Sequence, residues 1–166
     1  RQQALLAYLV LHRGTPQSRH HLAFLFWPDT GEAQSLTNLR NLLHKLRQAL
    51  PEAERFLQSD AQTVQWRPDA PCTLDVADFA ALAQSARKGD LEQAVNLYRG
   101  DLLPSCYDDW IQPECTRLQQ IATGALERLI GLLEEEHDML SVRAAVGYGR
   151  RLRQLDPLNK ATHRTM

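Results

Sequence analysis

The residues best suited to chemistry lie in the stretch "SLTNLRNLLHKLRQAL", residues 35–50. No acid occurs between Glu32 and Glu52, whereas an ordinary solvent-facing helix usually carries Glu and Lys in i,i+4 ion pairs. Arg and Lys donate to phosphate oxygens, and Asn, Gln and His can bond base edges. These residue types leave two interpretations open: a plain surface helix, or a helix that contacts DNA.

A helical wheel sorts this stretch into two faces. At about 100° per residue, the leucines fall within one narrow arc and are expected to pack against neighbouring helices. They are Leu36, Leu39, Leu43, Leu46 and Leu50. The opposite side is predicted to face a DNA groove with Asn41, His44, Lys45 and Gln48. Arg40 and Arg47 share one flank, where they would hold phosphates.

Other candidate clusters favour simpler interpretations. The adjacent histidines of "SRHH" (18–21) point about 100° apart on a helix, so they cannot easily share a metal ion. "EEEHD" (134–138) is typical of a solvated turn, and "GYG" (147–149) lacks the GK[ST] of a phosphate loop. No catalytic motif is found. The sequence therefore predicts a protein that is not an enzyme and that uses no metal and no cofactor.

Composition narrows the class of protein further. The 166 residues are 43% hydrophobic and 23% charged, and no apolar run approaches the roughly 18 residues of a membrane span. Three cysteines without CxxC spacing favour a reducing, cytoplasmic location. Residues 1–50 hold six Lys/Arg against two acids, and residues 51–166 hold thirteen against eighteen. This asymmetry predicts an anionic partner for the first part and a different task for the second.

Turn residues divide the first part into three helices and a hairpin. The first helix, residues 1–13, ends at Gly14, and "TPQS" forms a turn in which Ser18 caps a short helix ending at Pro28. Asp29 and Glu32 have the spacing of a capping box for the helix that ends at Leu50. "SDAQTVQW" (59–66) predicts a hairpin, and "RPDAP" predicts a domain boundary near residue 70.

The second part reads as helical throughout. A helix pair is predicted on either side of a turn at "KGD" (88–90), followed by helices over 113–137 and 140–155 and a last one beginning near Asn159. Ala94 and Ala145 are the small residues expected where helices approach closely, as in tetratricopeptide repeats. The expected fold class is mainly α: a winged helix-turn-helix of three helices and a small β-hairpin wing, then an all-α tetratricopeptide-like domain.

Helix order strengthens the DNA interpretation. In a helix-turn-helix the second helix of the motif enters the major groove, and here that helix is the third of the chain. "LLAYL", "LFWPD" and "NLRNLLHKLRQAL" resemble the winged-helix domain of SARP-type bacterial activators. "LDVADF", "LYRGDLLP" and "DWIQPE" resemble the bacterial transcriptional activator domain that follows it in that family.

The resemblance implies a function and a set of site residues. It implies binding to double-stranded promoter DNA, often as side-by-side copies that form a homodimer, and recruitment of RNA polymerase. The implied recognition residues are Arg40, Asn41, His44, Lys45, Arg47 and Gln48. Arg19, His20 and Arg67 are candidates for flanking backbone contacts. The loop 27–35, with Asp29, Thr30 and Glu32, matches the place where relatives touch polymerase.

The sequence also departs from the family pattern. Gln48 stands where many relatives have Arg, and Gln65-Trp66 replaces a Gly-Tyr pair in the wing. The strands that normally precede the first helix are missing, so the expectation is a piece of a longer protein with domains at 1–70 and 71–166. The alternative is a protein-interaction scaffold of a larger signalling ATPase, with a vestigial winged helix.

Overall fold

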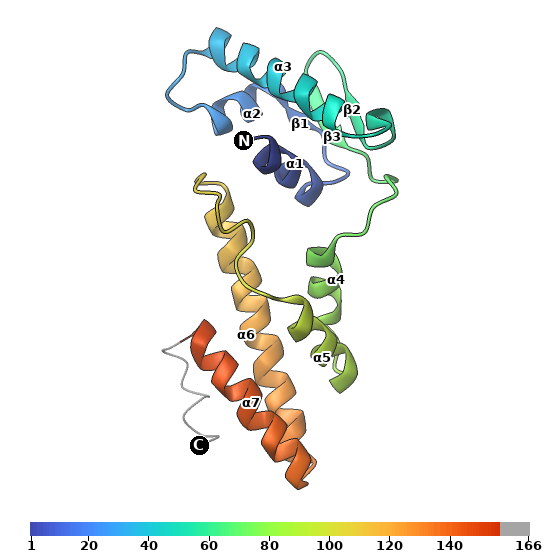
Figure 1. Cartoon of the computed structure of the whole chain (residues 1–166), viewed down its shortest axis with the longest axis vertical. Helices are drawn as coiled ribbons and strands as arrows, with labels where there is room; N and C mark the ends of the chain where they lie inside the picture. Colours follow the sequence, from blue (N-terminus) through green and yellow to red (C-terminus); the bar gives the residue numbers. More distant parts are fainter. Residues whose placement is uncertain (157–166) are drawn as a thin grey trace. The chain divides into compact units, whose positions relative to one another are not determined.

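The computed structural model describes residues 1–156 (Figure 1). They form seven α-helices and one three-stranded sheet, which confirms the predicted mainly α class. The chain divides into two compact units. The first comprises Arg1–Thr73 with Ser105–Trp110, and the second comprises Leu74–Pro104 and the chain from Ile111 onward. The domain boundary near residue 70 stays a prediction, because compactness alone does not show that either unit folds by itself.

The first unit contains three helices and the sheet. Its elements are α1 (Gln2–Leu11), β1 (Gln17–Ser18), α2 (Arg19–Phe26), α3 (Glu32–Ala49), the short 3₁₀ helix η1 (Ala53–Arg55), β2 (Leu57–Ser59) and β3 (Thr63–Trp66). β3 is the central strand and pairs antiparallel with both neighbours, so that Val64 lies between Gln17 and Ser59. The predicted hairpin is confirmed. The predicted "TPQS" turn instead contributes the third strand, β1.

The leucine face of α3 closes the core of the first unit. Leu39, Leu43 and Leu46 are at most 2% exposed, and they pack with residues of α1, α2 and the hairpin. Burial of each such side chain contributes about 1.5–3 kcal/mol. Leu36 and Leu50 are only partly buried and lie at the edge of this cluster. The leucine stripe is therefore structural, and the opposite face of α3 is left toward solvent.

Of the two helix starts predicted in the first unit, one is confirmed and the other is wrong. Ser18 caps α2, since its hydroxyl accepts a hydrogen bond from the His21 N–H at 3.5 Å. The capping box at Asp29 and Glu32 is wrong: α3 begins at Glu32 after Gly31, and no side chain caps it. A capping box needs its acid at the third helical position, whereas Glu32 occupies the first.

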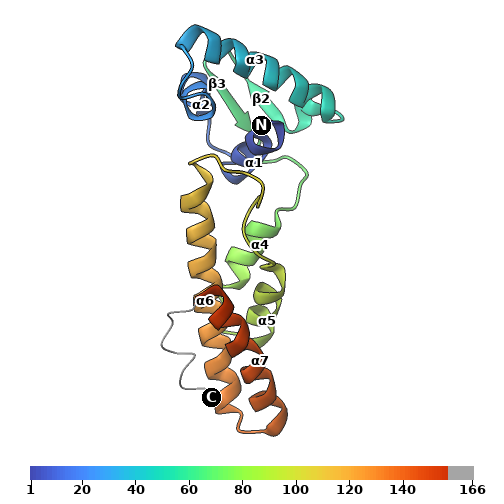
Figure 2. The ribbon, with the colours of Figure 1, turned by 60° about the vertical axis from the view of Figure 1, so that its left-hand side comes forward.

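The second unit contains α4 (Asp75–Leu82), α5 (Lys88–Leu97), α6 (Ile111–Glu135) and α7 (Met139–Leu155). α5 packs against both α4 and α6, and α7 lies along α6 (Figure 2). Ala94 and Ala145 are both buried in the shared core, as expected for close helix contacts. The helix expected near Asn159 lies outside the described residues.

The turn predicted at "KGD" is wrong. Residues 88–90 form the first turn of α5, and the connection from α4 lies upstream of them. Ser85 explains the difference, because its hydroxyl donates to the Asp90 carboxylate at 2.6 Å and accepts from the Arg87 N–H at 3.1 Å. Asp90 then lies in the first turn of α5, where the helix dipole favours an acid.

Candidate nucleic-acid interface

The outer face of α3 is the candidate interface. It is defined here by the exposed side chains opposite the buried leucines, namely Arg40, Asn41, His44, Lys45 and Gln48. Within residues 1–156, none of these five side chains forms a hydrogen bond or an ion pair with another residue. Their polar groups are therefore free to bind a partner.

The charge of this outer face is not neutralised by nearby acids. The acids closest in sequence are Glu32, which is the first residue of α3, and Glu52 and Glu54, which follow the helix; each has its own partner. Glu32 accepts from His20 Nδ1 at 2.9 Å, and Glu52 Oε2 lies 2.6 Å from Arg55 Nη1. Glu54 lies 3.8 Å from the Nε of Arg47. The positive charges of the outer face thus remain uncompensated, which favours an anionic partner.

Arg47 differs from the other predicted groove residues. Its side chain is 32% exposed, and its guanidinium donates to the Ser59 hydroxyl on β2 as well as approaching Glu54. These contacts join the C-terminal part of α3 to the hairpin. Arg47 therefore holds the two elements together in the structure, where the sequence predicted a phosphate contact.

Arg19 lies beside the turn of the hairpin. Its backbone N–H donates to the Gln62 carbonyl at 2.8 Å, and its side-chain Nε is buried without a hydrogen-bond partner. The Asp60 carboxyl in the same turn has a lowered pKa, mainly because it accepts from the backbone N–H groups of Gln62 and Thr63. The positive charge of Arg19 adds a smaller effect in the same direction. Arg19, which the sequence predicted as a backbone contact, thus lies next to the hairpin turn.

The other two predicted backbone contacts are engaged with acids. His20 bonds Glu32, as described above, and both side chains are mostly exposed. Arg67 forms a two-point contact with Asp69, with Nε at 3.2 Å from Oδ1 and Nη2 at 3.3 Å from Oδ2. This contact lowers the pKa of the Asp69 carboxyl and raises that of Arg67. Either residue would have to exchange its acid for a phosphate in order to bind DNA.

The predicted polymerase-contact loop borders a pocket. This pocket has a volume of about 450 Å³, and Thr30 and Glu32 line it together with Phe24 and Trp27. Asp29 is exposed nearby. Phe24 is 69% exposed on α2, and the sequence analysis did not single it out. Leu22, Ala23 and Phe26 form the buried face of α2, and Phe24 lies off that face.

Among residues 1–156, no group of three or more His, Cys, Asp or Glu side chains could hold a metal ion. None of Cys72, Cys106 and Cys115 forms a disulfide. Within the same range, every helix is too short or too polar to cross a membrane.

The protein is thus mainly α-helical, and the exposed face of α3, next to a small hairpin, carries positive charges without internal partners in residues 1–156. Residues 73–166 match the family described as the bacterial transcriptional activator domain. The match covers more than half of the chain, and the chain belongs to this family. The family indicates a role in transcriptional activation. Its members are regulatory domains, and it is not an enzyme family. No curated protein matches the chain.

Proposed function

We propose that the chain is a sequence-specific DNA-binding transcriptional activator of the SARP type. The observation that carries this proposal is the outer face of α3, which is exposed, free of acids and without internal partners. The family supplies the regulatory role, and the first unit supplies a helix of the right kind beside a hairpin. The proposed protein is cytoplasmic, is not an enzyme, and comprises a winged-helix domain at 1–70 and a tetratricopeptide-like domain at 71–166.

In this proposal α3 enters the major groove, which is wide enough for a helix. Asn41, His44, Lys45 and Gln48 contact base edges, and Arg40 contacts phosphate. Arg47 keeps the wing in register with α3 and reaches phosphate only by releasing Ser59. Arg19, His20 and Arg67 contact the backbone on either side, the last two after exchange of their acids.

The remaining parts of the proposal concern partners. The loop residues Asp29, Thr30 and Glu32 contact RNA polymerase next to the Phe24 and Trp27 pocket. The helical domain mediates oligomerisation or signal input, with a homodimer on repeated DNA sites as the expected assembly.

The test compares two double variants of the chain by fluorescence anisotropy. The DNA is a labelled fragment from upstream of the chain's own gene, titrated at several salt concentrations. Arg40→Ala with Lys45→Ala removes two free cations from α3, and we expect the slope of log affinity against log salt to fall by about one per lost phosphate contact. Arg150→Ala with Arg153→Ala is the control, because these exposed arginines of α7 remove equal charge from the other unit.

Two outcomes decide the proposal. Loss of affinity in the α3 variant, with the α7 control unchanged, supports binding through the outer face. Equal affinity of the parent and the α3 variant would contradict it.

A scaffold function is the second candidate, and one observation favours it. The family match begins at residue 73 and does not cover residues 1–72, which include α1, α2, α3 and the sheet. In this alternative the winged helix is vestigial and the helical part binds a protein within a larger signalling ATPase. Absence of any DNA binding at low salt would favour this alternative.

A further inference from the structure

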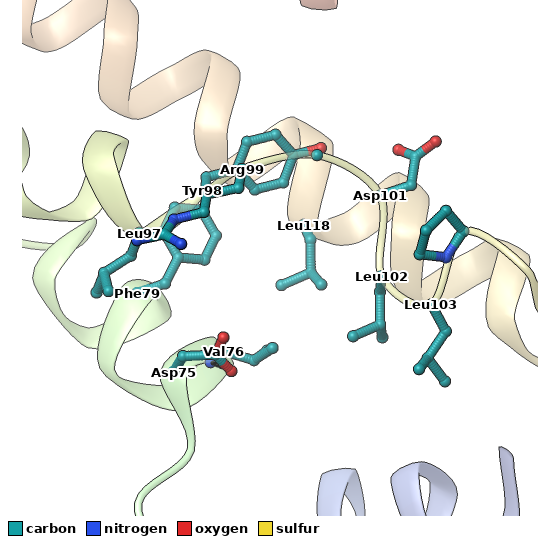
Figure 3. Close-up of a pocket in the computed structure, with 12 residues that line it drawn as sticks. Asp75, Val76, Phe79, Leu97, Tyr98, Arg99, Asp101, Leu102, Leu103 and Leu118 are labelled. Carbon is teal, nitrogen blue, oxygen red and sulfur yellow. Dashed lines mark hydrogen bonds between the residues drawn. The ribbon is translucent and has the colours of Figure 1, made fainter. Parts of the chain in front are cut away.

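The second unit contains a pocket that the proposed function does not use. It lies between α4, the segment 97–104 and α6, and has a volume of about 710 Å³ (Figure 3). Small-molecule sites usually have volumes of about 300–1,000 Å³ and combine apolar walls with a few polar groups. This pocket has the size and the composition of such a site.

Apolar side chains from three segments line most of the pocket. Val76 and Phe79 come from α4, Leu102 and Leu103 from the connecting segment, and Leu118 from α6. The Phe79 ring lies 5.5 Å from the ring of Tyr98, centroid to centroid. An apolar body of a ligand would therefore find contacts on several sides.

The connecting segment is fixed at both ends by side chains of other helices. The Tyr98 carbonyl accepts a hydrogen bond from the Arg151 guanidinium, and the Leu102 carbonyl accepts from the Cys115 thiol at 3.5 Å. Between and beside these points the backbone is bent, with φ of +143° at Gly100 and +48° at Leu103. The pocket is thus shaped by the fold before any ligand binds.

The carboxylates of the pocket differ in direction. In Figure 3 the Asp75 carboxylate lies beside Val76 at the start of α4, whereas the Asp101 carboxylate points away from the side chains of Leu102 and Leu103. Asp75 accepts a hydrogen bond from the Val76 N–H at 2.8 Å, and no cation within residues 1–156 pairs with it. Asp75 is therefore an anionic group that remains available next to an apolar surface.

We propose that this pocket binds a small molecule that has an apolar body and a single primary amine. The body lies against Val76, Phe79 and Leu118, and the ammonium group pairs with Asp75. Arg99 also lines the pocket, and its positive charge would repel a second ammonium group of a ligand. Binding of this kind does not depend on whether the chain binds DNA.

The test uses the whole chain with methyl-labelled Leu and Val, observed by NMR. Octylamine, octanol and octanoate are the probes, because they share one chain length and differ only in the charge of the end group. We expect octylamine to shift the Val76 and Leu118 methyl signals and to bind about tenfold more tightly than octanol, which corresponds to ~1.4 kcal/mol. Octanoate should bind more weakly than octylamine.

Two isosteric variants locate the charge effect. Asp75→Asn should abolish the preference for octylamine over octanol, while Asp101→Asn should keep it. Unchanged methyl signals far from the pocket serve to show that each variant is folded. Equal binding of the three probes, tightest binding of octanoate, equal loss in both variants, or shifts that avoid Val76 and Leu118 would each overturn the proposal.

Discussion

Two arginines of the second unit bind backbone carbonyls of the fold, whereas the basic side chains on the outer face of α3 have no partner in the described part of the chain. In the second unit, Arg128 donates to the carbonyls of Ala83 and Ser85, and Arg151 donates to the Tyr98 carbonyl. On the outer face of α3, the side chains of Arg40 and Lys45 form no hydrogen bond or ion pair within residues 1–156. The same residue types thus stabilise the second unit at Arg128 and Arg151 and carry positive charge without a partner among the described residues at Arg40 and Lys45.

This difference distinguishes arginines that stabilise the fold from arginines that are available for binding. Arg128 closes the C-terminal end of α4, where the last carbonyls of a helix lack internal partners. Arg40 has no such task in the described part of the chain, and in the proposed function it contacts a DNA phosphate. Single substitutions of these basic residues test the difference. The free energy of unfolding should fall when Arg128 is removed and should hardly change when Arg40 is removed.

The largest effect is expected for Arg128→Ala. This change leaves the carbonyls of Ala83 and Ser85 without their donor, and we expect a loss of about 1–3 kcal/mol in the free energy of unfolding. Urea denaturation of the whole chain, followed by circular dichroism, measures it. Arg150→Ala is the matched control in the same unit and should stay within about 0.5 kcal/mol of the parent. If both variants unfold at the same urea concentration, Arg128 does not stabilise the second unit, and its difference from Arg40 disappears.

An intermediate effect is expected within α3 itself, from two arginines seven residues apart on one flank. Arg47→Ala loses the bond to Ser59 and should destabilise the first unit by about 0.5–1.5 kcal/mol. Arg40→Ala should change stability by less than about 0.5 kcal/mol. Thermal and urea unfolding of both variants measures these two changes in stability. A larger loss from Arg40→Ala than from Arg47→Ala would mean that Arg40 stabilises the fold and is not free to bind a partner.

The smallest effect is expected for the exposed pair of Lys88 and Glu136, whose Nζ and Oε2 lie 2.8 Å apart. The hydrogen bond from Lys88 lowers the pKa of the Glu136 carboxyl, followed by the one from Ser141. A lowered pKa in the folded state means that Glu136 contributes stability above its ordinary pKa of 4.5, and that this contribution disappears as the pH falls through the lower folded value.

Glu136→Gln tests this pH dependence. The urea midpoint of the variant should lie slightly below that of the parent at neutral pH, and the two should converge as the pH falls below about 4.5. High salt should reduce the difference at neutral pH, because exposed ion pairs are screened. If the difference between the two urea midpoints instead grows as the pH falls, the pKa of Glu136 is not lowered in the folded state and the prediction is wrong.

Local patterns in the sequence predicted most of the elements. Gly14, Pro28 and Pro51 mark where helices end, and the leucines of residues 36–50 identify the buried side of α3. Both kinds of signal act within a few residues along the chain: turn residues constrain the local backbone, and the helical repeat assigns each side chain to a face. The two errors, at Asp29 and at "KGD", are helix starts, which depend on hydrogen bonds that several spacings could satisfy.

Contacts between elements could not be predicted in the same way. Arg47 with Ser59, and His20 with Glu32, join residues twelve positions apart on different elements. Trp110 is the clearest case, because it lies far along the sequence and yet packs edge-on against Tyr8 of the first unit, with ring centroids 5.3 Å apart. No periodicity links these positions.

The sequence by itself determined the acid-free polar face of α3 and its position opposite the leucines, since both follow from residue type and the 3.6-residue repeat. Only the tertiary structure decided which basic residues on and around that face are free. Arg40 and Lys45 remain available, while Arg47, His20 and Arg67 are held by neighbours. The physical reason is that the rotation and spacing of packed elements determine which side chains come within hydrogen-bonding distance.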